Sequence, residues 1–394
     1  MHAVEIDWGP PNGYEILEYQ LSPSSWNRYE ECPRKYWLSR QGLPRKTGMP
    51  IVIGNTIHNS VEDICNLEIL NKGDDEKNWL PKLAKKTLDH HWKLQKDIFF
   101  NTPRHPKWKQ NSYNKAFEGL NKALYMLLSH VKIDDVKLSN VTLRMWKKIK
   151  INILANEGTM NSRCGKLMGR LDLLLRDFDD EGNESGWIVV DLKTGKPPKE
   201  KLSNTINRQL LFYRDLLKLI NLDHPPMRAE GWYTSNQTIH EAIGPSVTDD
   251  ALATHSLIEL TNTPFQATPE DFTCGFCEWK AWCPSWLIAI EDGILKKGGR
   301  FTNEVVTLAN FDPEEGLALF KKMIPDGQNG NLKDSGEKFG AFLVNQPLDQ
   351  LRALCSEGYE GALFIGSARI DGETRHLGDW SEILPWNPLL ESIR

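Results

Sequence analysis

The hydrophobic pattern is helical over the first part of the chain. Residues 22–36 start with Ser22-Pro23, a capping residue and an early proline, and continue with aromatic side chains at helical spacing, so they predict a helix that Cys32-Pro33 interrupts or ends. Residues 51–70 repeat apolar side chains at intervals of three and four and predict a second helix. The pattern remains helical from residue 79 to about residue 150.

Strands are predicted after residue 165. Two apolar runs, residues 166–176 and 187–193, are separated by the turn sequence Asp-Asp-Glu-Gly-Asn and predict a hairpin whose second strand is buried. A Gly- and Pro-containing loop follows, and then residues 209–220 predict a helix that Pro225-Pro226 ends before a short strand at residues 231–235. Further short β-like runs alternate with Gly and Asp turns at residues 304–308, 340–344 and 362–370.

Length and composition predict two domains. A chain of 394 residues, 40% of them hydrophobic, can bury a sizeable core and usually exceeds one domain. We place the boundary near Gly293, before a Lys- and Gly-rich linker, which divides the chain into residues 1–292 and 293–394. The second part predicts a small β-rich domain, either an OB-like barrel that grips single-stranded DNA or a module that docks a helicase or replication partner.

Hydropathy and charge argue against some classes of protein. No apolar run reaches the roughly 18–20 residues of a membrane span, and no signal-length run follows Met1, so we expect a cytoplasmic protein without a membrane contact. The formal net charge of -5 argues against a polyanion partner. However, residues 104–150 hold eleven Lys and Arg against three acidic residues, a stretch that predicts either a solvated helical face or a nucleic-acid contact surface.

Two carboxylates and a lysine converge on the predicted hairpin. Asp172 lies on the first strand, while Asp191 and Lys193 flank Leu192 on the second strand and therefore point to one face. Such a trio suits Mg²⁺ or Mn²⁺ chemistry, because the ion polarises a phosphate and activates water while the ammonium group steadies developing charge. The reaction would be phosphodiester hydrolysis. The alternative is that these residues form surface ion pairs.

Four motifs in this order resemble the PD-(D/E)XK nuclease superfamily, and two of them its RecB-like branch. The resemblance covers about residues 21–287. The motifs are Gly54-x-x-x-His58, Gly169-x-x-Asp172, Asp191-x-Lys193 and Gln209-x-x-x-Tyr213. Alone, a histidine on an apolar helix would more often be a packed or exposed residue. The third motif begins with Asp instead of the commoner Glu, which the family accepts.

The resemblance implies a role for each motif residue. The metal ligands would be His58, Asp172, Asp191 and the carbonyl of Leu192, and Lys193 would be the catalytic lysine. Gln209 and Tyr213 would contact DNA near the scissile phosphate or order the site. They are four residues apart and therefore lie on one helix face.

The same resemblance implies a fold and an activity. The expected fold is α/β, with a restriction-endonuclease-like core in which helices flank a mixed central sheet, and with a helical insertion over about residues 70–150. The expected activity is that of a metal-dependent DNA exonuclease on single-stranded ends, with a 5′→3′ preference. Arg34, Lys35 and Arg170, together with the basic stretch, are candidate contacts to the DNA backbone. The alternatives are a catalytically idle DNA-binding or scaffolding subunit of a nuclease/helicase complex and a cysteine-ligated redox protein.

Four of the seven cysteines form a further pattern. Cys274, Cys277 and Cys283 are clustered and Cys32 lies far upstream, an arrangement that can hold Zn²⁺ or an iron–sulfur cluster. Spacing alone does not choose between them. The order, one cysteine before the core and three after it, resembles the iron–sulfur nucleases of the RecB/AddB-like branch, which implies a structural [4Fe-4S] clasp, with Zn²⁺ as the alternative. We expect Cys65, Cys164 and Cys355 to be inert thiols.

Overall fold

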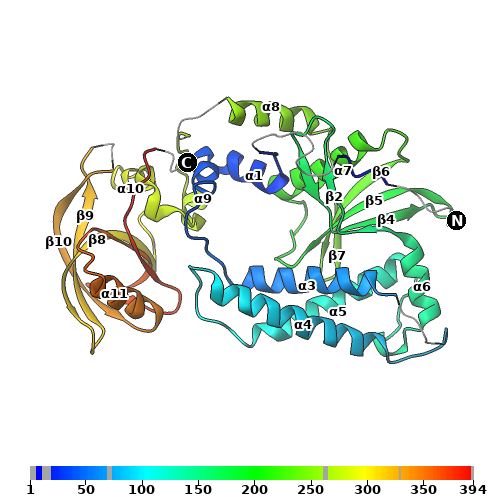
Figure 1. The fold of residues 1–394 in the computed structure, drawn as a ribbon, viewed down its shortest axis with the longest axis horizontal. Coiled ribbons are helices and arrows are strands. Elements are labelled where there is room, and N and C mark those ends of the chain that lie inside the picture. Colours follow the sequence, from blue (N-terminus) through cyan, green and yellow to red (C-terminus); the bar gives the residue numbers. More distant parts are fainter. Residues whose placement is uncertain (1–5, 11–18, 69–72, 261–264, 328–329, 392–394) are drawn as a thin grey trace. The chain divides into compact units, whose positions relative to one another are not determined.

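The chain divides into two compact units in the computed structural model, which describes residues 6–10, 19–68, 73–260, 265–327 and 330–391 (Figure 1). Unit 1 comprises Met1–Asn27, Thr47–Asn101 and Lys109–Leu260. Unit 2 comprises Arg28–Lys46, Thr102–Trp108 and Thr261–Arg394. The predicted boundary near Gly293 therefore lies inside unit 2, which also contains all four cysteines of the predicted cluster site.

A five-stranded mixed sheet forms the centre of unit 1. Its strands, in spatial order, are β1 (Ile153–Asn156), β4 (Leu173–Phe178), β5 (Glu184–Lys193), β6 (Met227–Tyr233) and β7 (Thr238–Glu241). β5 and β6 are parallel, and the other neighbours are antiparallel. A separate pair consists of β2 (Thr159–Asn161) and β3 (Met168–Arg170). The strand predicted over residues 166–176 is thus two strands, β3 and β4, with a bend between them at Asp172.

Helices cover both faces of this sheet (Figure 1). α7 (Asn204–Ile220) makes the crossover between the parallel strands β5 and β6, and the Ser203 side chain caps it by accepting from the Ile206 N–H. The other helices of unit 1 are α3 (Met49–Asn66), α4 (Leu80–Asn101), α5 (Ser112–His130), the short η1 (Leu138–Asn140), α6 (Leu143–Asn152) and α8 (Thr248–Glu259). The predicted insertion contains α4 to α6, and its predicted start at residue 70 lies outside the described residues. This architecture is consistent with the expected restriction-endonuclease-like class.

Side-chain alternation along β6 separates the two faces. Gly231 faces α7, where an added Cβ would lie 3.5 Å from the Leu210 side chain. The neighbouring Trp232 faces the other way, with its ring 6.0 Å from that of His130 at the end of α5. Asp191 is in register with Gly231 and Leu192 with Trp232. The register therefore directs Asp191 toward α7 and Leu192 away from it.

Unit 2 contains a small closed barrel. Its strands are β8 (Phe301–Asp312), β9 (Leu317–Pro325), β10 (Leu332–Leu343), β11 (Leu363–Asp371) and β12 (Thr374–Leu377), with α11 (Gln346–Ser356) between β10 and β11. The pairings run β8–β9–β10–β12–β11 and return from β11 to β8, and β10 pairs with β12 in parallel. β13 (Glu382–Pro385) extends the sheet at β11. Phe320, Phe339 and Ile365 pack in the barrel interior.

A second apolar cluster of unit 2 is rich in tryptophan. Trp279, Trp282 and Trp286 pack together with the half-buried Cys274 and Cys277. The helices of this region are α1 (Pro23–Glu31), which begins in unit 1, α2 (Pro33–Leu38), α9 (Asp271–Phe276), the short η2 (Lys280–Trp282) and α10 (Pro284–Glu291). None of the described helices is long and apolar enough to cross a membrane.

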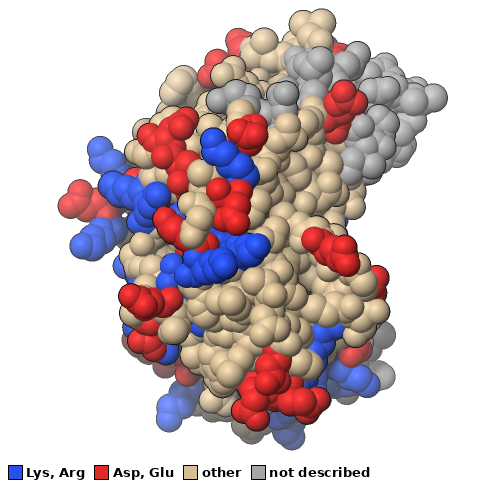
Figure 2. Space-filling model, turned by 90° about the vertical axis from the view of Figure 1, so that its left-hand side faces the viewer, with Lys and Arg blue, Asp and Glu red and all other residues tan. Residues whose placement is uncertain are grey.

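Basic residues predicted as DNA contacts differ in exposure. Arg34 and Arg104 are 7% and 2% exposed, so they are not surface contacts in this structure. Arg104 instead forms hydrogen bonds and an ion pair with Glu382 at 3.0 Å. Lys147 is exposed and pairs with Asp74. Figure 2 shows one face of the molecule, on which Lys and Arg are interspersed with Asp and Glu around a broad uncharged area.

The Arg104–Glu382 pair predicts a pH-dependent stability of unit 2. Burial alone would raise the pKa of Glu382, but the hydrogen bonds and charge of Arg104 and the charge of Lys46 hold it below its usual value. A depressed carboxyl pKa adds stability above the unfolded-state pKa of about 4.3, and this stability is lost as pH falls through the folded-state value. Glu382→Gln should therefore lower the free energy of unfolding at pH 7 by about 3 kcal/mol, because Arg104 loses its buried partner.

Urea unfolding followed by tryptophan fluorescence between pH 3 and pH 7 tests this expectation. The difference between the parent and Glu382→Gln should shrink as the pH falls below about 4. Glu337→Gln is the matched control, because the Glu337 side chain is 69% exposed and should change the free energy of unfolding little. A difference that stayed constant over this pH range would contradict the assigned role of the pair.

Candidate active site

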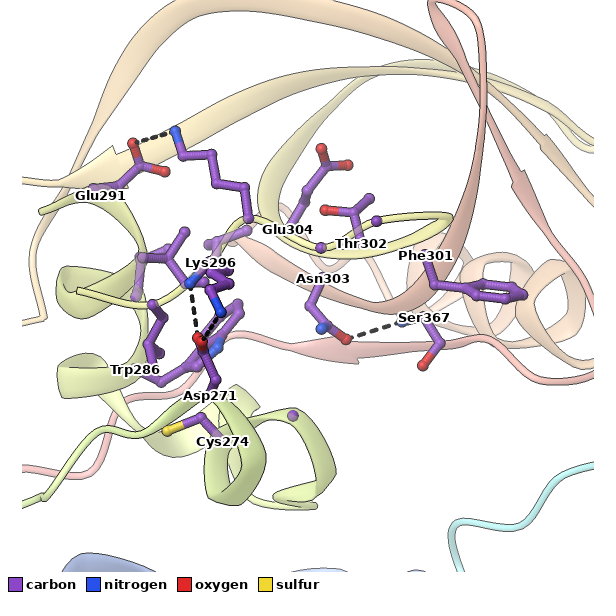
Figure 3. Close-up of a pocket in the computed structure, with 18 of the residues that line it drawn as sticks. Asp271, Cys274, Trp286, Glu291, Lys296, Phe301, Thr302, Asn303, Glu304 and Ser367 are labelled. Atoms are coloured by element: carbon purple, nitrogen blue, oxygen red, sulfur yellow. Dashed lines mark hydrogen bonds and ion pairs between the residues drawn. The ribbon is translucent and has the colours of Figure 1, made fainter. Parts of the chain in front are cut away.

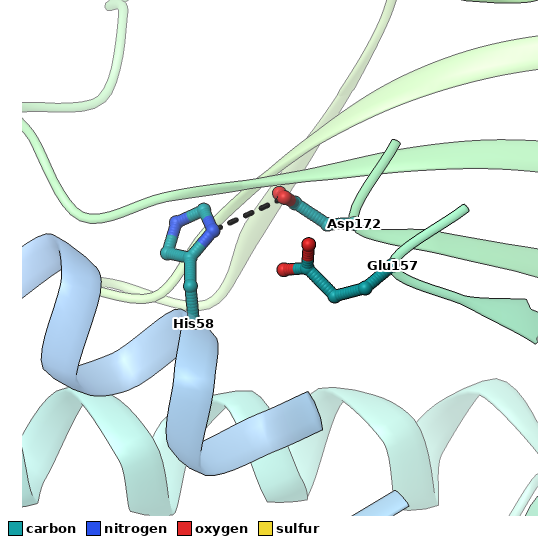
Figure 4. A group of neighbouring side chains, drawn as sticks. All are labelled: His58, Glu157 and Asp172. Carbon is teal, nitrogen blue, oxygen red and sulfur yellow. Dashed lines mark hydrogen bonds and ion pairs between the residues drawn. The ribbon is translucent and has the colours of Figure 1, made fainter. Parts of the chain in front are cut away.

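Two coinciding bends bring carboxylates together at the edge of the unit 1 sheet. Glu157 lies between β1 and β2, and Asp172 lies between β3 and β4. The Glu157 N–H donates to the Asp172 carbonyl at 2.9 Å, and the Leu171 N–H donates to the Gly158 carbonyl at 3.0 Å. Both segments therefore turn at the same level, where the two side chains meet His58 (Figure 4).

His58 reaches this point from α3. Its Nδ1 lies 3.1 Å from Asp172 Oδ1, while Asp172 Oδ2 accepts the Leu192 N–H at 2.7 Å. The ligand atoms of His58, Glu157 and Asp172 all lie within 4.8 Å of one another, the only such trio of His, Cys, Asp or Glu among the described residues. Asp172 thus links the helix, the bend and the end of β5.

Asp191 and Lys193 lie in a second group on the α7 side of β5. Asp191 Oδ2 is 2.6 Å from Lys193 Nζ, and Asp191 Oδ1 accepts from Gln209 Nε2 at 3.1 Å. Gln209 also accepts from Lys193 Nζ at 3.0 Å and donates to the Tyr213 hydroxyl at 3.2 Å. One amide side chain therefore orients the carboxylate, the ammonium group and the phenol.

Gly169 has a steric role in the same region. A Cβ at this position would lie 3.0 Å from the Tyr213 ring and 3.3 Å from Met160, closer than side chains usually approach. The absence of a side chain lets β3 pass over the tyrosine. This close approach gives a physical reason for the glycine three residues before Asp172.

Burial and neighbouring charges shift the pKa values of the site residues. Burial lowers the pKa of His58, but the charges of Asp172, Asp191 and Glu157 outweigh it and raise the value to about 9. Burial, together with Asp172, raises the pKa of Asp191 against the opposing effect of Lys193. Burial and Asp172 likewise raise the pKa of Glu157. Three carboxylates are held here at an energetic cost that a cation would relieve.

The residue set fits a divalent metal ion. Carboxylate oxygens and an imidazole are ligands that Mg²⁺ or Mn²⁺ accepts. Asp191 is 6% exposed, and its Oδ2 makes no geometrically good hydrogen bond, although Lys193 Nζ is close by. A buried carboxylate oxygen directed into an acidic site is a suitable metal ligand.

All six predicted motif residues lie in two adjoining groups, and one further residue was not predicted. His58 and Asp172 meet in the first group, and Asp191, Lys193, Gln209 and Tyr213 in the second. The structure adds Glu157, whose backbone has a φ of 59°, an uncommon conformation for this residue type. The following glycine, Gly158, is the only local sign of a turn. Arg170, a predicted DNA contact, is 59% exposed and pairs with Glu157 and, at 3.7 Å, with Glu62.

The four cysteines predicted to bind a cluster line one small cavity within unit 2. Arg34, Lys35 and Lys280 line the same cavity, and no carboxylate does. Arg34 and Lys280 are each 7% exposed. Free thiols and buried cations therefore lie together in this cavity. The cations would stabilise the negative charge of a group bound through thiolates.

Burial shifts the pKa values of several groups that line this cavity. It raises the pKa of Cys277 to about 11 and that of Cys283 to about 12, and it lowers the pKa of the Lys280 ammonium group. Cys277 and Cys283 are thus protonated at neutral pH without a metal. Cys65, predicted to be inert, is also buried, and burial raises its pKa to about 12.

Comparison with known proteins identifies the family. Residues 20–284 match the family model described as the PD-(D/E)XK nuclease superfamily. No curated protein sequence matches the chain. A solved structure titled "Crystal structure of SSO0001" is 12% identical with a TM-score of 0.24, over 66% of this chain and 96% of that chain, a likeness too distant to add to the assignment. Because the family match covers more than half of the chain, the protein belongs to the PD-(D/E)XK nuclease superfamily, whose members are nucleases that act on DNA with divalent metal ions.

Proposed function

We propose that the protein is a Mg²⁺- or Mn²⁺-dependent exonuclease that degrades single-stranded DNA ends with a 5′→3′ preference. The observation that carries this proposal is the meeting of His58, Glu157 and Asp172 beside the Asp191–Lys193 pair. Acidic oxygens, an imidazole and an oriented ammonium group at one sheet edge are what phosphodiester hydrolysis needs. The polarity and the preference for ends rest on the resemblance to the RecB-like branch.

The side chains of the site would have separate roles in the reaction. His58, Asp172, Asp191 and the Leu192 carbonyl would hold the ion, with Glu157 as an additional carboxylate. A bound divalent ion polarises the phosphate and lowers the pKa of a water molecule. The Lys193 ammonium group, fixed by Asp191 and Gln209, would stabilise the negative charge that develops on the phosphate.

Gln209 and Tyr213 would act as positioning residues. Gln209 contacts Lys193, Asp191 and Tyr213 at once, so its loss would leave the ammonium group held by Asp191 alone. Tyr213 is buried, and burial together with Asp191 raises its pKa, which keeps the phenol neutral. A neutral phenol serves as a hydrogen-bond partner and not as a base.

A catalytically idle DNA-binding or scaffolding subunit of a nuclease/helicase complex is the second candidate. Such a subunit has no need of a lysine held between a carboxylate and an amide. The Lys193–Asp191 contact at 2.6 Å and the Lys193–Gln209 hydrogen bond at 3.0 Å therefore favour the enzyme.

We also propose that Cys32, Cys274, Cys277 and Cys283 hold a structural [4Fe-4S] cluster. The buried cations beside these cysteines would offset the negative charge of a thiolate-bound group. The preference for the cluster over Zn²⁺ rests on the resemblance to the RecB/AddB-like nucleases. Its binding would close a loop of about 240 residues.

Lys193→Ala and Asp172→Ala should each slow cleavage of a labelled single strand by at least about a hundredfold, because each loses a group that acts on developing charge. Strands labelled at the 5′ or 3′ end, incubated with Mn²⁺, measure both rate and polarity. Lys201→Ala is the control, since Lys201 is exposed and outside the site. Parent-like cleavage by both site variants would remove the nuclease proposal, and shortening from the 3′ end alone would reverse the polarity.

Glu157→Gln should weaken Mn²⁺ binding by more than about tenfold, because even partners of metal ligands have effects of that size. Isothermal titration calorimetry on the full chain measures the change. Glu62→Gln is the matched control, since Glu62 is also near Arg170 but lies outside the His58, Glu157 and Asp172 trio. Equal affinities of the two variants would show that Glu157 is not a ligand.

Anaerobically purified protein should contain about four iron atoms and show the broad visible absorption of an iron–sulfur cluster. Cys283→Ser should lose both the iron and the colour, because a buried hydroxyl is a poor replacement for a thiolate ligand. Cys355→Ser should keep them, since Cys355 is an exposed thiol outside the cavity. Stoichiometric zinc without iron would favour the alternative.

A further inference from the structure

Unit 2 contains a cavity of about 600 Å³ that lies beside the cysteine site and shares Cys274 and Trp286 with its lining (Figure 3). Its walls come from α9, α10, the segment 295–299, the start of β8 and part of β9. This size lies within the range of small-molecule sites in proteins. We propose that the cavity receives a base of the single-stranded DNA substrate, an inference that rests on the proposed function.

The interior of the cavity is apolar and aromatic. Trp286, which is 4% exposed, forms part of the wall together with Ile290 and Met323. The Trp286 ring is held by an edge-on contact with Phe364 at 5.6 Å. The half-buried Ile290 and Met323, backed by this indole, offer an apolar surface against which a planar base can pack, whatever its sequence.

Polar groups occupy one side of the cavity in fixed positions. Asn303 Oδ1 accepts from the Ser367 N–H at 3.0 Å, and the Ser367 carbonyl accepts from the Ser381 hydroxyl at 2.9 Å. Ser367 has a φ of 55° and lies where the pairing of β11 with β8 shifts register. It lines the cavity together with Thr302, whose hydroxyl can both donate and accept.

The mouth of the cavity is a basic, glycine-containing segment, Lys296-Lys297-Gly298-Gly299-Arg300. The side chains of Lys296 and Lys297 are 89% and 64% exposed. A Cβ on Gly298 would lie 2.1 Å from the Phe301 carbonyl, so this turn requires glycine. The lysines can therefore meet the phosphates on either side of an inserted base.

The ion pairs at the mouth are weak enough to exchange. Lys296 Nζ is 3.3 Å from Asp271, and Lys297 Nζ is 3.5 Å from Glu291. At such exposure an ion pair contributes little, so a phosphate can replace the carboxylate. The third carboxylate of the lining, Glu304, is already paired with Arg375 at 3.0 Å.

The balance of charge favours a base over a charged peptide. Three lysines and three carboxylates line the cavity, which is therefore close to neutral. A charged side chain inserted into the cavity would find no matching field, whereas a neutral base with donors and acceptors on its edge matches the Asn303, Thr302 and Ser367 side of the wall, and its phosphates would remain outside beside Lys296 and Lys297.

Anisotropy of a labelled oligothymidylate of about 20 nucleotides, with EDTA to prevent cleavage, tests the proposal on the full chain. Ile290→Trp fills the cavity from a half-buried wall position and should weaken binding about tenfold, the size of one lost base contact. Ile294→Trp is the matched control, because Ile294 is 64% exposed and does not line the cavity. A single 2-aminopurine in the strand should change its fluorescence on binding the parent and not on binding Ile290→Trp.

The double variant Lys296→Glu/Lys297→Glu keeps the test independent of cavity filling. It should also weaken binding, whereas Lys338→Glu, an exposed barrel lysine outside the lining, should not. Parent-like affinity of Ile290→Trp and of the lysine pair, at unchanged melting temperature, would overturn the proposal, as would a parent that binds no oligonucleotide.

The two proposals fail separately. A parent that binds through the cavity but cuts no strand with Mn²⁺ loses the proposed function and keeps this inference. A parent that cuts, but whose cavity variants bind and fluoresce like it, loses this inference alone.

Discussion

The mutual repulsion of three partly buried carboxylates is the constraint on which the nuclease unit depends. Glu157, Asp172 and Asp191 meet where the sheet edge excludes much of the solvent. Two unit charges 4 Å apart interact by about 4 kcal/mol at an effective dielectric constant near 20. Lys193, His58 and Arg170 supply positive charge from three different elements. The fold therefore has to hold like charges together, and a divalent cation is the group that most directly offsets them.

The backbone conformation also helps to hold these carboxylates close together. Asp172 stands at a bend and not within a strand, and the facing Glu157 adopts a left-handed conformation at the same level. The hydrogen bond from the Glu157 N–H to the Asp172 carbonyl ties the two bends together, so their backbones keep a fixed relative position. Rigid elements then complete the site, since His58 comes from α3 and Gln209 from the crossover helix α7. Such preorganisation fixes where a metal ion and a phosphate would meet.

The site residues that could be predicted from sequence patterns are those that lie close together in the chain. Asp191 and Lys193 share a face because strand side chains alternate, and Gln209 and Tyr213 share one because a helix turns every 3.6 residues. His58 could be proposed only through family resemblance, because its partners lie far away in the chain. The cysteine pattern indicated a metal or cluster site, but only the resemblance favoured an iron–sulfur cluster over zinc. Glu157 had no periodic signal, since its position depends on a bend that two segments make together. Charge likewise did not reveal that Arg34 and Arg104 are buried.

Net charge is a poor guide to how such a protein would hold a polyanion. The chain is acidic overall at -5, yet the carboxylates around the active site are those that a metal ion would neutralise. In unit 2 the charged residues at the large cavity occur in pairs of opposite sign. A strand held mainly by many unpaired lysines would be released steeply by salt, whereas a base packed against Ile290 and Met323 would be held by an uncharged surface. Contact with the strand through a metal ion and a buried base would therefore be compatible with an acidic protein, since neither requires a continuous basic surface.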